Sequence, residues 1–183
     1  MRSTIFASFL GLALMASPAY ADVHSYISHE AGFSFAAPGE MKTEKITYTS
    51  ASNGTRSATV FESVDDNIEF SVTVVDFKGV AASHEDLIKE ASTAYQARGK
   101  VMADSEARVE SIYGRKMTVD LPNNGGRSMA AIYFAGTYMV ELVTTVLPAN
   151  GDYGTPDMGR FVDSLAFRPD RAEQGSIELG MPK

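Results

Sequence analysis

The chain of 183 residues contains no cysteine. Structural disulfides, thiol chemistry and metal sites built on thiolates are therefore excluded. Basic residues are also few, because 16 lysines and arginines stand against 23 aspartates and glutamates, giving a formal net charge of −7. No cluster of Lys and Arg interrupts this acidic balance. Nucleic acids and anionic lipids are therefore not expected as partners.

Sequence motifs of common catalytic sites are missing as well. There is no Gly-x-Ser-x-Gly, no His-Glu-x-x-His, no phosphate-binding loop and no dinucleotide fingerprint. Histidine occurs only as His24, His29 and His84. His84 falls in the first turn of an expected helix, where the helix dipole disfavours imidazolium, so we interpret it as a solvated surface residue. An enzyme is not expected, and a hydrolase that uses carboxylates alone is the least favoured alternative.

The first 21 residues have the features of a secretory signal peptide. Arg2 precedes an apolar run at 5–16, and Pro18 is followed by Ala19-Tyr20-Ala21, which has small residues where a signal peptidase reads them. The run is too short to span a bilayer, and no later run approaches that length. We expect cleavage after Ala21 and a periplasmic or secreted protein. Because the signal has no lipid-anchor cysteine, no stable membrane anchor is expected after processing.

The remaining residues predict one domain over 22–168 and a flexible tail over 169–183. Strand patterns dominate its middle, where residues 68–74 alternate between apolar and polar. Residues 138–147 are apolar on both faces, which predicts a central, doubly covered strand. Two loops rich in Asn and Gly predict hairpins. The strands flanking these loops are expected at 42–50 and 55–63 and at 114–121 and 127–135.

Two helices are expected. Ser83 is the predicted N-cap of the first and Gly99 its end, with an apolar stripe of Leu87, Ile88, Ala91, Ala94 and Tyr95. The second is predicted to start at Thr155-Pro156 and to end at Arg168-Pro169, with a stripe of Met158, Phe161, Val162 and Leu165. The predicted fold class is therefore α+β, an antiparallel sheet of about six or seven strands covered by two main helices.

The order of these segments resembles that of PsbP-like and DcrB-type proteins. Residues 33–39 (Phe-Ser-Phe-Ala-Ala-Pro-Gly) are similar to the opening strand of that family, and residues 160–167 to its terminal Arg-Phe-x-x-Ser-Leu helix. The bend at Gly114-Arg115 follows in the same order. The resemblance covers most of residues 24–168 and implies a sandwich whose members are mostly non-enzymatic accessory or binding proteins. It implies no catalytic residue, and we expect a soluble periplasmic protein that engages a protein partner or a small ligand.

The expected mature amino terminus, Asp22-Val23-His24, suggests an alternative. A free amine, two backbone amides and an imidazole at the third position form a square of four nitrogens that suits Cu(II) or Ni(II). The square forms only if cleavage follows Ala21, because histidine must stand third. A single histidine in a short window also occurs by chance, so copper binding is an alternative function and no other cofactor is expected.

A small acidic loop is a second candidate for metal. Asp65, Asp66, Asn67 and Glu69 offer oxygen ligands of the kind that Ca²⁺ prefers. The loop lacks the pattern of a calcium-binding loop, however, and Gly125-Gly126 likewise indicates a turn more than a phosphate cradle. We interpret the acidic loop as a solvated turn.

Glu141 is the one charged residue within the apolar strand at 138–147. A buried carboxylate has a raised pKa and marks a candidate pocket. Arg115 and Arg127 lie on neighbouring predicted strands, and an ion pair between Glu141 and one of them is the favoured interpretation.

Overall fold

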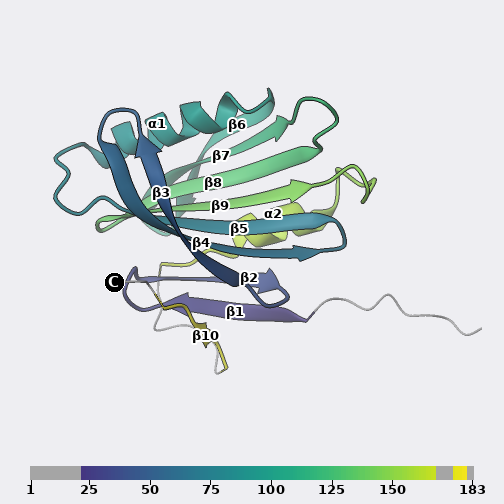
Figure 1. The fold of residues 1–183 in the computed structure, drawn as a ribbon, viewed down its shortest axis with the longest axis horizontal. Coiled ribbons are helices and arrows are strands. Elements are labelled where there is room, and N and C mark those ends of the chain that lie inside the picture. The colour runs from purple at the N-terminus through teal and green to yellow at the C-terminus, as the bar shows by residue number, and fades with distance from the viewer. Residues whose placement is uncertain (1–21, 168–174, 181–183) are drawn as a thin grey trace, which may run out of the picture.

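The structure is a computed structural model that describes residues 22–167 and 175–180. The predicted signal peptide at 1–21 therefore lies outside the described residues. A seven-stranded antiparallel sheet forms the centre, in the order β3-β4-β5-β9-β8-β7-β6 (Figure 1). Its strands are β3 (Lys42–Ser50), β4 (Gly54–Asp65), β5 (Ile68–Asp76), β6 (Lys100–Val109), β7 (Ile112–Asp120), β8 (Arg127–Ala135) and β9 (Tyr138–Val146). The α+β class, both predicted hairpins and the central place of β9 are confirmed.

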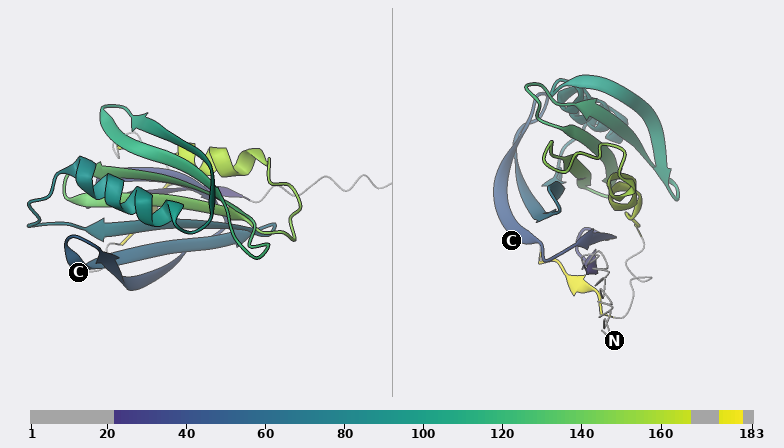
Figure 2. Two further views of the ribbon diagram at one scale, coloured as in Figure 1. Left: turned by 90° about the horizontal axis from the view of Figure 1, so that it is seen from above. Right: turned by 90° about the vertical axis from the view of Figure 1, so that its right-hand side faces the viewer.

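A second, three-stranded sheet lies at the other side of the molecule from helix α1 (His84–Gln96), as Figure 2 shows in its right-hand view. Its order is β10-β1-β2, with β1 at Val23–Ser28, β2 at Phe33–Pro38 and β10 at Ile177–Glu178. The sequence placed β10 in a flexible tail. Instead it pairs in parallel with β1, the Leu179 amide donates to the Ile27 carbonyl at 2.7 Å, and the Leu179 side chain is buried. Residues 169–174 and 181–183 of the predicted tail lie outside the described residues, as does residue 168.

Helix α2 (Pro156–Asp163) and the small sheet cover one face of the large sheet. Aromatic rings dominate this core. The ring of Phe161 lies 5.2 Å from that of Phe70 and 6.1 Å from that of Phe35, edge to face in both pairs. We call this side the α2 face. Phe161 therefore anchors α2, as its apolar stripe predicts.

Helix α1 covers part of the opposite face, over β7 and β8. We call this side the α1 face. Ser83 is the N-cap, and its hydroxyl accepts a hydrogen bond from the Asp86 amide at 3.1 Å. The helix ends at Gln96, before the predicted end at Gly99. Gly99 is required for another reason, because a Cβ there would lie 2.2 Å from the Asp120 carbonyl oxygen. Ala94, assigned to the buried stripe, is exposed, and Ser92 is buried in its place.

Helix α2 is shorter than the sequence predicted. It ends at Asp163, with Ser164 as its C-cap, well before Arg168-Pro169. The Ser164 hydroxyl bonds to the carbonyls of Phe161 and Ala36, and Ala166 exchanges two backbone hydrogen bonds with Ser34 of β2. Pairing with β2 therefore draws the chain out of the helix.

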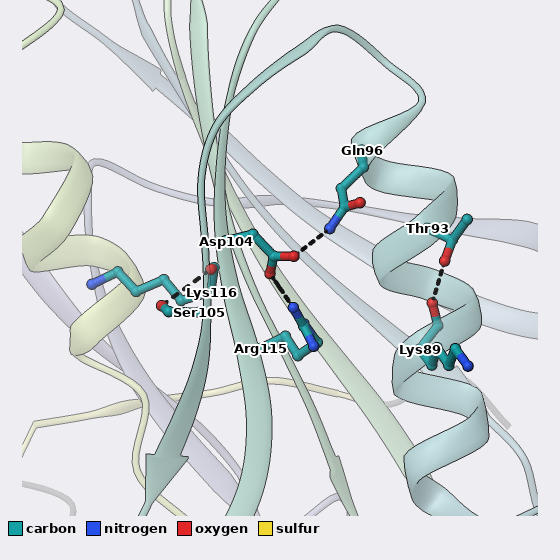
Figure 3. Close-up of polar contacts among 7 residues, drawn as sticks. All are labelled: Lys89, Thr93, Gln96, Asp104, Ser105, Arg115 and Lys116. Carbon is teal, nitrogen blue, oxygen red and sulfur yellow. Dashed lines mark hydrogen bonds and ion pairs between the residues drawn. The ribbon is translucent and has the colours of Figure 1, made fainter.

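Polar contacts tie the β6–β7 edge of the sheet to both helices. Asp104 accepts a hydrogen bond from Gln96 of α1 at 2.8 Å and forms an ion pair with Arg115 (Figure 3). On the other face, the Lys116 ammonium lies 2.7 Å from a carboxylate oxygen of Asp163 in α2. Gly114 lies inside β7 and forms no bend there; a Cβ at this position would meet the Tyr133 ring at 2.3 Å.

Candidate functional site

A cavity of about 340 Å³ opens on the α1 face, beside the carboxyl end of α1. We call it the trough. Strands β4, β5 and β9 form its floor, and Arg98, just beyond the helix, forms one wall. Its polar and charged lining residues are Glu62, Ser63, Glu69, Ser71, Thr73, Arg98, Glu141 and Thr145.

The strand register explains why these strand residues, apart from Ser63, share one face; Ser63 pairs with Phe70 and points to the α2 face. In β5, Glu69 pairs with Thr145 of β9, and Thr73 pairs with Glu141. Directly paired residues of antiparallel strands point to the same side of a sheet, and alternate residues point to opposite sides. Helix α1 lies over β7 and β8 and leaves this part of the face without a helix above it. Polar side chains of β5 and β9 are therefore accommodated here.

Glu141 is the most perturbed group of the trough. Its side chain is largely buried, and burial raises its pKa to about 7, while the nearby Arg98 guanidinium acts in the opposite direction. The favoured pairing with Arg115 or Arg127 is wrong. Arg115 pairs with Asp104, and the Arg127 guanidinium lies 2.7 Å from a carboxylate oxygen of Asp120. Glu141 does line a pocket, as a buried carboxylate in an apolar strand suggested.

Arg98 brings a positive charge to the trough, opposite in sign to that of an ionised Glu141. Its guanidinium lies 5.1 Å from the centre of the Tyr95 ring, a cation–π contact that holds it at the wall of the trough. Tyr95 is fixed in turn, since its hydroxyl donates to the Ser128 hydroxyl at 2.8 Å. Among the described residues, neither Arg98 nor Glu141 takes part in an ion pair. Two opposite charges thus share one cavity without a direct contact between them.

The predicted copper ligands lie at the start of β1. Asp22 and Val23 are exposed, and the His24 ring is half-buried near the Tyr26 ring, with 6.4 Å between centroids. The Asp22 carbonyl accepts a hydrogen bond from the Gly39 amide at 3.2 Å, and His24 pairs with Ala37. Within the described part of the chain, no group of three or more His, Asp or Glu side chains is placed to hold a metal ion. A site at the amino terminus would depend on its amine and amides.

The acidic loop forms a tight turn between β4 and β5. Asp66 and Asn67 have φ angles of 45° and 57°, and Asp65 pairs with Ile68. The side-chain amide of Asn150 donates to the Asp66 carbonyl at 2.7 Å. The residues chosen as oxygen ligands thus shape a hairpin turn.

His84 lies at a second, more open groove of about 630 Å³, between the start of α1 and the tip of the β6–β7 hairpin. It is exposed, as predicted, but its ring also stacks on Phe134 with 4.1 Å between centroids. The stacking gives it a packing role at the end of the helix.

Comparisons with known proteins concern the fold. No family model matches the chain, and no curated protein matches its sequence. The solved structures include a similar chain, the solution structure of the cyanobacterial PsbP protein CyanoP from Synechocystis sp. PCC 6803, at 12% identity and a TM-score of 0.52. The match covers 85% of this chain and 97% of that one. This chain therefore has a PsbP-like fold. No helix among the described residues is long and apolar enough to cross a membrane.

Proposed function

We propose that this chain is an exported, non-enzymatic binding protein whose small ligand occupies the trough. The observation that carries the proposal is the pair of opposite charges at Arg98 and Glu141, which share a cavity but form no ion pair with each other. A concave site with a few convergent polar groups and a perturbed carboxyl is typical of ligand binding. The signal-like sequence at 1–21 supports export to the periplasm.

The arrangement of carboxylates does not favour a hydrolase. Glu69 and Glu141 line the same trough, but Glu69 pairs with Thr145, four residues along β9 from Glu141. At about 3.4 Å per residue, their Cα atoms are about 14 Å apart. Acid and base pairs of glycoside hydrolases hold their carboxyl groups about 5–10 Å apart. Glu62 lies diagonally across from Glu69, because it pairs with Ser71, but both side chains are exposed and lack the burial that tunes a catalytic carboxyl. The trough therefore has the features of a binding site more than those of a two-carboxylate catalytic site.

Blocking the trough tests this function. Ser71 lies in the floor, so Ser71→Trp would fill the cavity, whereas Ser105→Trp places the same side chain on the exposed strand β6 outside it. Each protein is incubated with the small-molecule fraction of a periplasmic extract and examined by native mass spectrometry. We expect a mass adduct on the parent and on Ser105→Trp that is absent from Ser71→Trp. An adduct that survives in Ser71→Trp would contradict the proposal by placing the ligand outside the trough. The absence of an adduct on the parent would also contradict it and would favour a protein partner.

Copper binding at the mature amino terminus is a second proposal. It is supported by the exposure of Asp22 and Val23, which leaves the end of β1 accessible to an ion. Binding displaces two amide protons, so it should strengthen as pH rises. His24→Ala and an added amino-terminal methionine should both abolish the visible Cu(II) spectrum, and His29→Ala should leave it intact. A spectrum that persists in the methionine-extended protein would rule this site out.

A further inference from the structure

The charges of the trough also indicate which ligand it takes, an inference that rests on the proposed function. We infer that the ligand is a free basic amino acid, with its α-carboxylate on Arg98 and its α-ammonium on Glu141. A zwitterion carries both charges, and the trough offers a partner of opposite charge for each of them. Each protein charge would then gain the ion pair that it lacks within the described structure.

Size limits the ligand. The cavity volume of about 340 Å³ is at the low end of the range of about 300–1,000 Å³ found for sites that bind drug-sized molecules. A single amino acid fits this range better than an oligopeptide. The hydroxyls of Ser71 and Thr73 on the floor offer further hydrogen bonds to an ammonium or a carboxylate.

The excess of carboxylates makes the ligand basic. Glu62 and Glu69 line the same cavity as Glu141, and both are exposed. Three carboxyl groups and one guanidinium therefore line the same cavity. A ligand that carries only the two charges of a zwitterion would leave Glu62 and Glu69 without a positively charged partner. The cationic side chain of arginine or lysine, directed away from Glu141, would meet Glu62 and Glu69 at the rim. An acidic amino acid would be repelled there.

Binding should depend on pH in a defined direction. The α-ammonium requires an ionised Glu141, whose pKa burial raises to about 7, so affinity should rise as pH increases through 7. Two other ionisable groups near Glu141, the hydroxyls of Tyr48 and Tyr95, stay neutral over this range, because burial raises their pKa values to about 12. The charge of the Arg98 guanidinium acts on the pKa of Glu141 in the direction opposite to burial.

The experiment is isothermal titration of the processed chain at pH 8 with four probes. These are L-arginine, agmatine (which lacks the carboxylate), Nα-acetyl-L-arginine (which lacks the ammonium) and L-glutamate. We expect L-arginine to bind, each truncated probe to bind about tenfold more weakly or worse, and L-glutamate not to bind. L-lysine, titrated as a fifth ligand, should behave as L-arginine does.

Matched variants assign each contact. Arg98→Gln should weaken L-arginine about tenfold but leave agmatine unchanged, and Glu141→Gln should weaken L-arginine while removing the rise in affinity through pH 7. Glu106→Gln, an exposed glutamate of β6 outside the trough, serves as the control and should change nothing.

Two results would overturn the inference. One is no binding of L-arginine or L-lysine to the parent, and the other is equal binding to the parent, Arg98→Gln and Glu141→Gln. If the extract still gives an adduct that Ser71→Trp abolishes, the trough remains a binding site and only the ligand class is wrong. If that adduct is also missing, the proposed function itself fails.

Discussion

The two faces of the large sheet differ although the same strands build both. Along β5, Phe70, Val72 and Val74 point to the α2 face and are at most 3% exposed. The residues between them, Ser71 and Thr73, point to the α1 face and line the trough. A helix and a second sheet cover the first face, whereas α1 covers the other over β7 and β8. The cover above a strand therefore decides whether its alternate residues become core or site.

The largest expected loss of stability comes from creating a cavity in the core of the α2 face. Phe161 is 3% exposed and packs edge to face on Phe70 and Phe35, so Phe161→Ala leaves a cavity among rings. We expect a loss of about 3–5 kcal/mol in the free energy of unfolding. Urea denaturation measures it, with Met102→Ala as the control, because Met102 is 46% exposed on β6. An unchanged midpoint for Phe161→Ala would mean that α2 does not pack as described.

The partly covered face should respond to pH. The pKa of Glu141 is about 7 in the folded chain and near 4.5 when unfolded, so the folded state holds its proton longer. Ionisation of the buried Glu141 carboxyl therefore lowers the free energy of unfolding. This destabilisation is absent below pH 4.5, grows between pH 4.5 and 7 and is complete above pH 7. Relative to Glu141→Gln, the parent should lose about 1–3 kcal/mol of stability over this window.

Denaturation of both proteins at pH 4, 5.5 and 8 measures that loss. Glu62→Gln is the control, because Glu62 lines the same trough but is exposed. A constant difference between the parent and Glu141→Gln at all three values would show that Glu141 is solvated, and the contrast between the two faces would then be smaller than described.

A smaller effect is expected where the β3–β4 hairpin is held to α1. Glu90 accepts hydrogen bonds from the hydroxyls of Ser50 and Ser52 and from the amides of Ala51 and Ser52. Burial raises the pKa of this carboxyl, but the hydrogen bonds outweigh burial and hold the pKa below its usual value. Glu90→Ala should cost about 1–2 kcal/mol near neutral pH.

The cost of Glu90→Ala should shrink in acid, because the group's stabilising contribution is lost as pH falls through its lowered pKa. Thermal unfolding at pH 7 and at pH 3 checks both statements. Lys89→Ala, an exposed neighbour on the same helix, should have little effect at either pH. A cost at pH 3 equal to that at pH 7 would show that the hairpin is not held by the ionised carboxylate.

Local signals in the sequence were sufficient for most elements of both faces. The Asn-Gly turn after β3, the alternation of β5 and the N-cap Ser83 act within a few residues, and the structure bears each of them out. Strand β6 has a weaker signal, because most of its residues are exposed and a register shift between Val101 and Ala103 breaks its alternation. Edge strands commonly have this character.

The trough could not be assembled from sequence in the same way. Glu141 stands out in the sequence because it interrupts an apolar strand, but no local pattern marks Arg98 as the opposite charge in the same cavity. The neighbours of Glu141 follow from the strand order β5-β9-β8, which brings Thr73 and Ile132 to its two sides. Hydrophobic alternation gives the faces of each strand but not which strands are adjacent.

The smallest expected effects come from two neighbouring threonines of β9 that point to opposite faces. Thr144 lies on the α2 face, fully buried, and its hydroxyl has no hydrogen-bond partner among the described residues. Thr145 lies on the α1 face, where its hydroxyl is 2.9 Å from that of Ser128.

Thr144→Val removes an unpaired buried hydroxyl at constant shape and should stabilise the fold by about 1 kcal/mol. Thr145→Val removes a partner of Ser128 and should destabilise it by a similar amount. Chemical denaturation measures the change in the free energy of unfolding of each variant relative to the parent, and each variant is the control for the other. Two shifts of the same sign would show that the faces do not differ in how they satisfy buried hydroxyls.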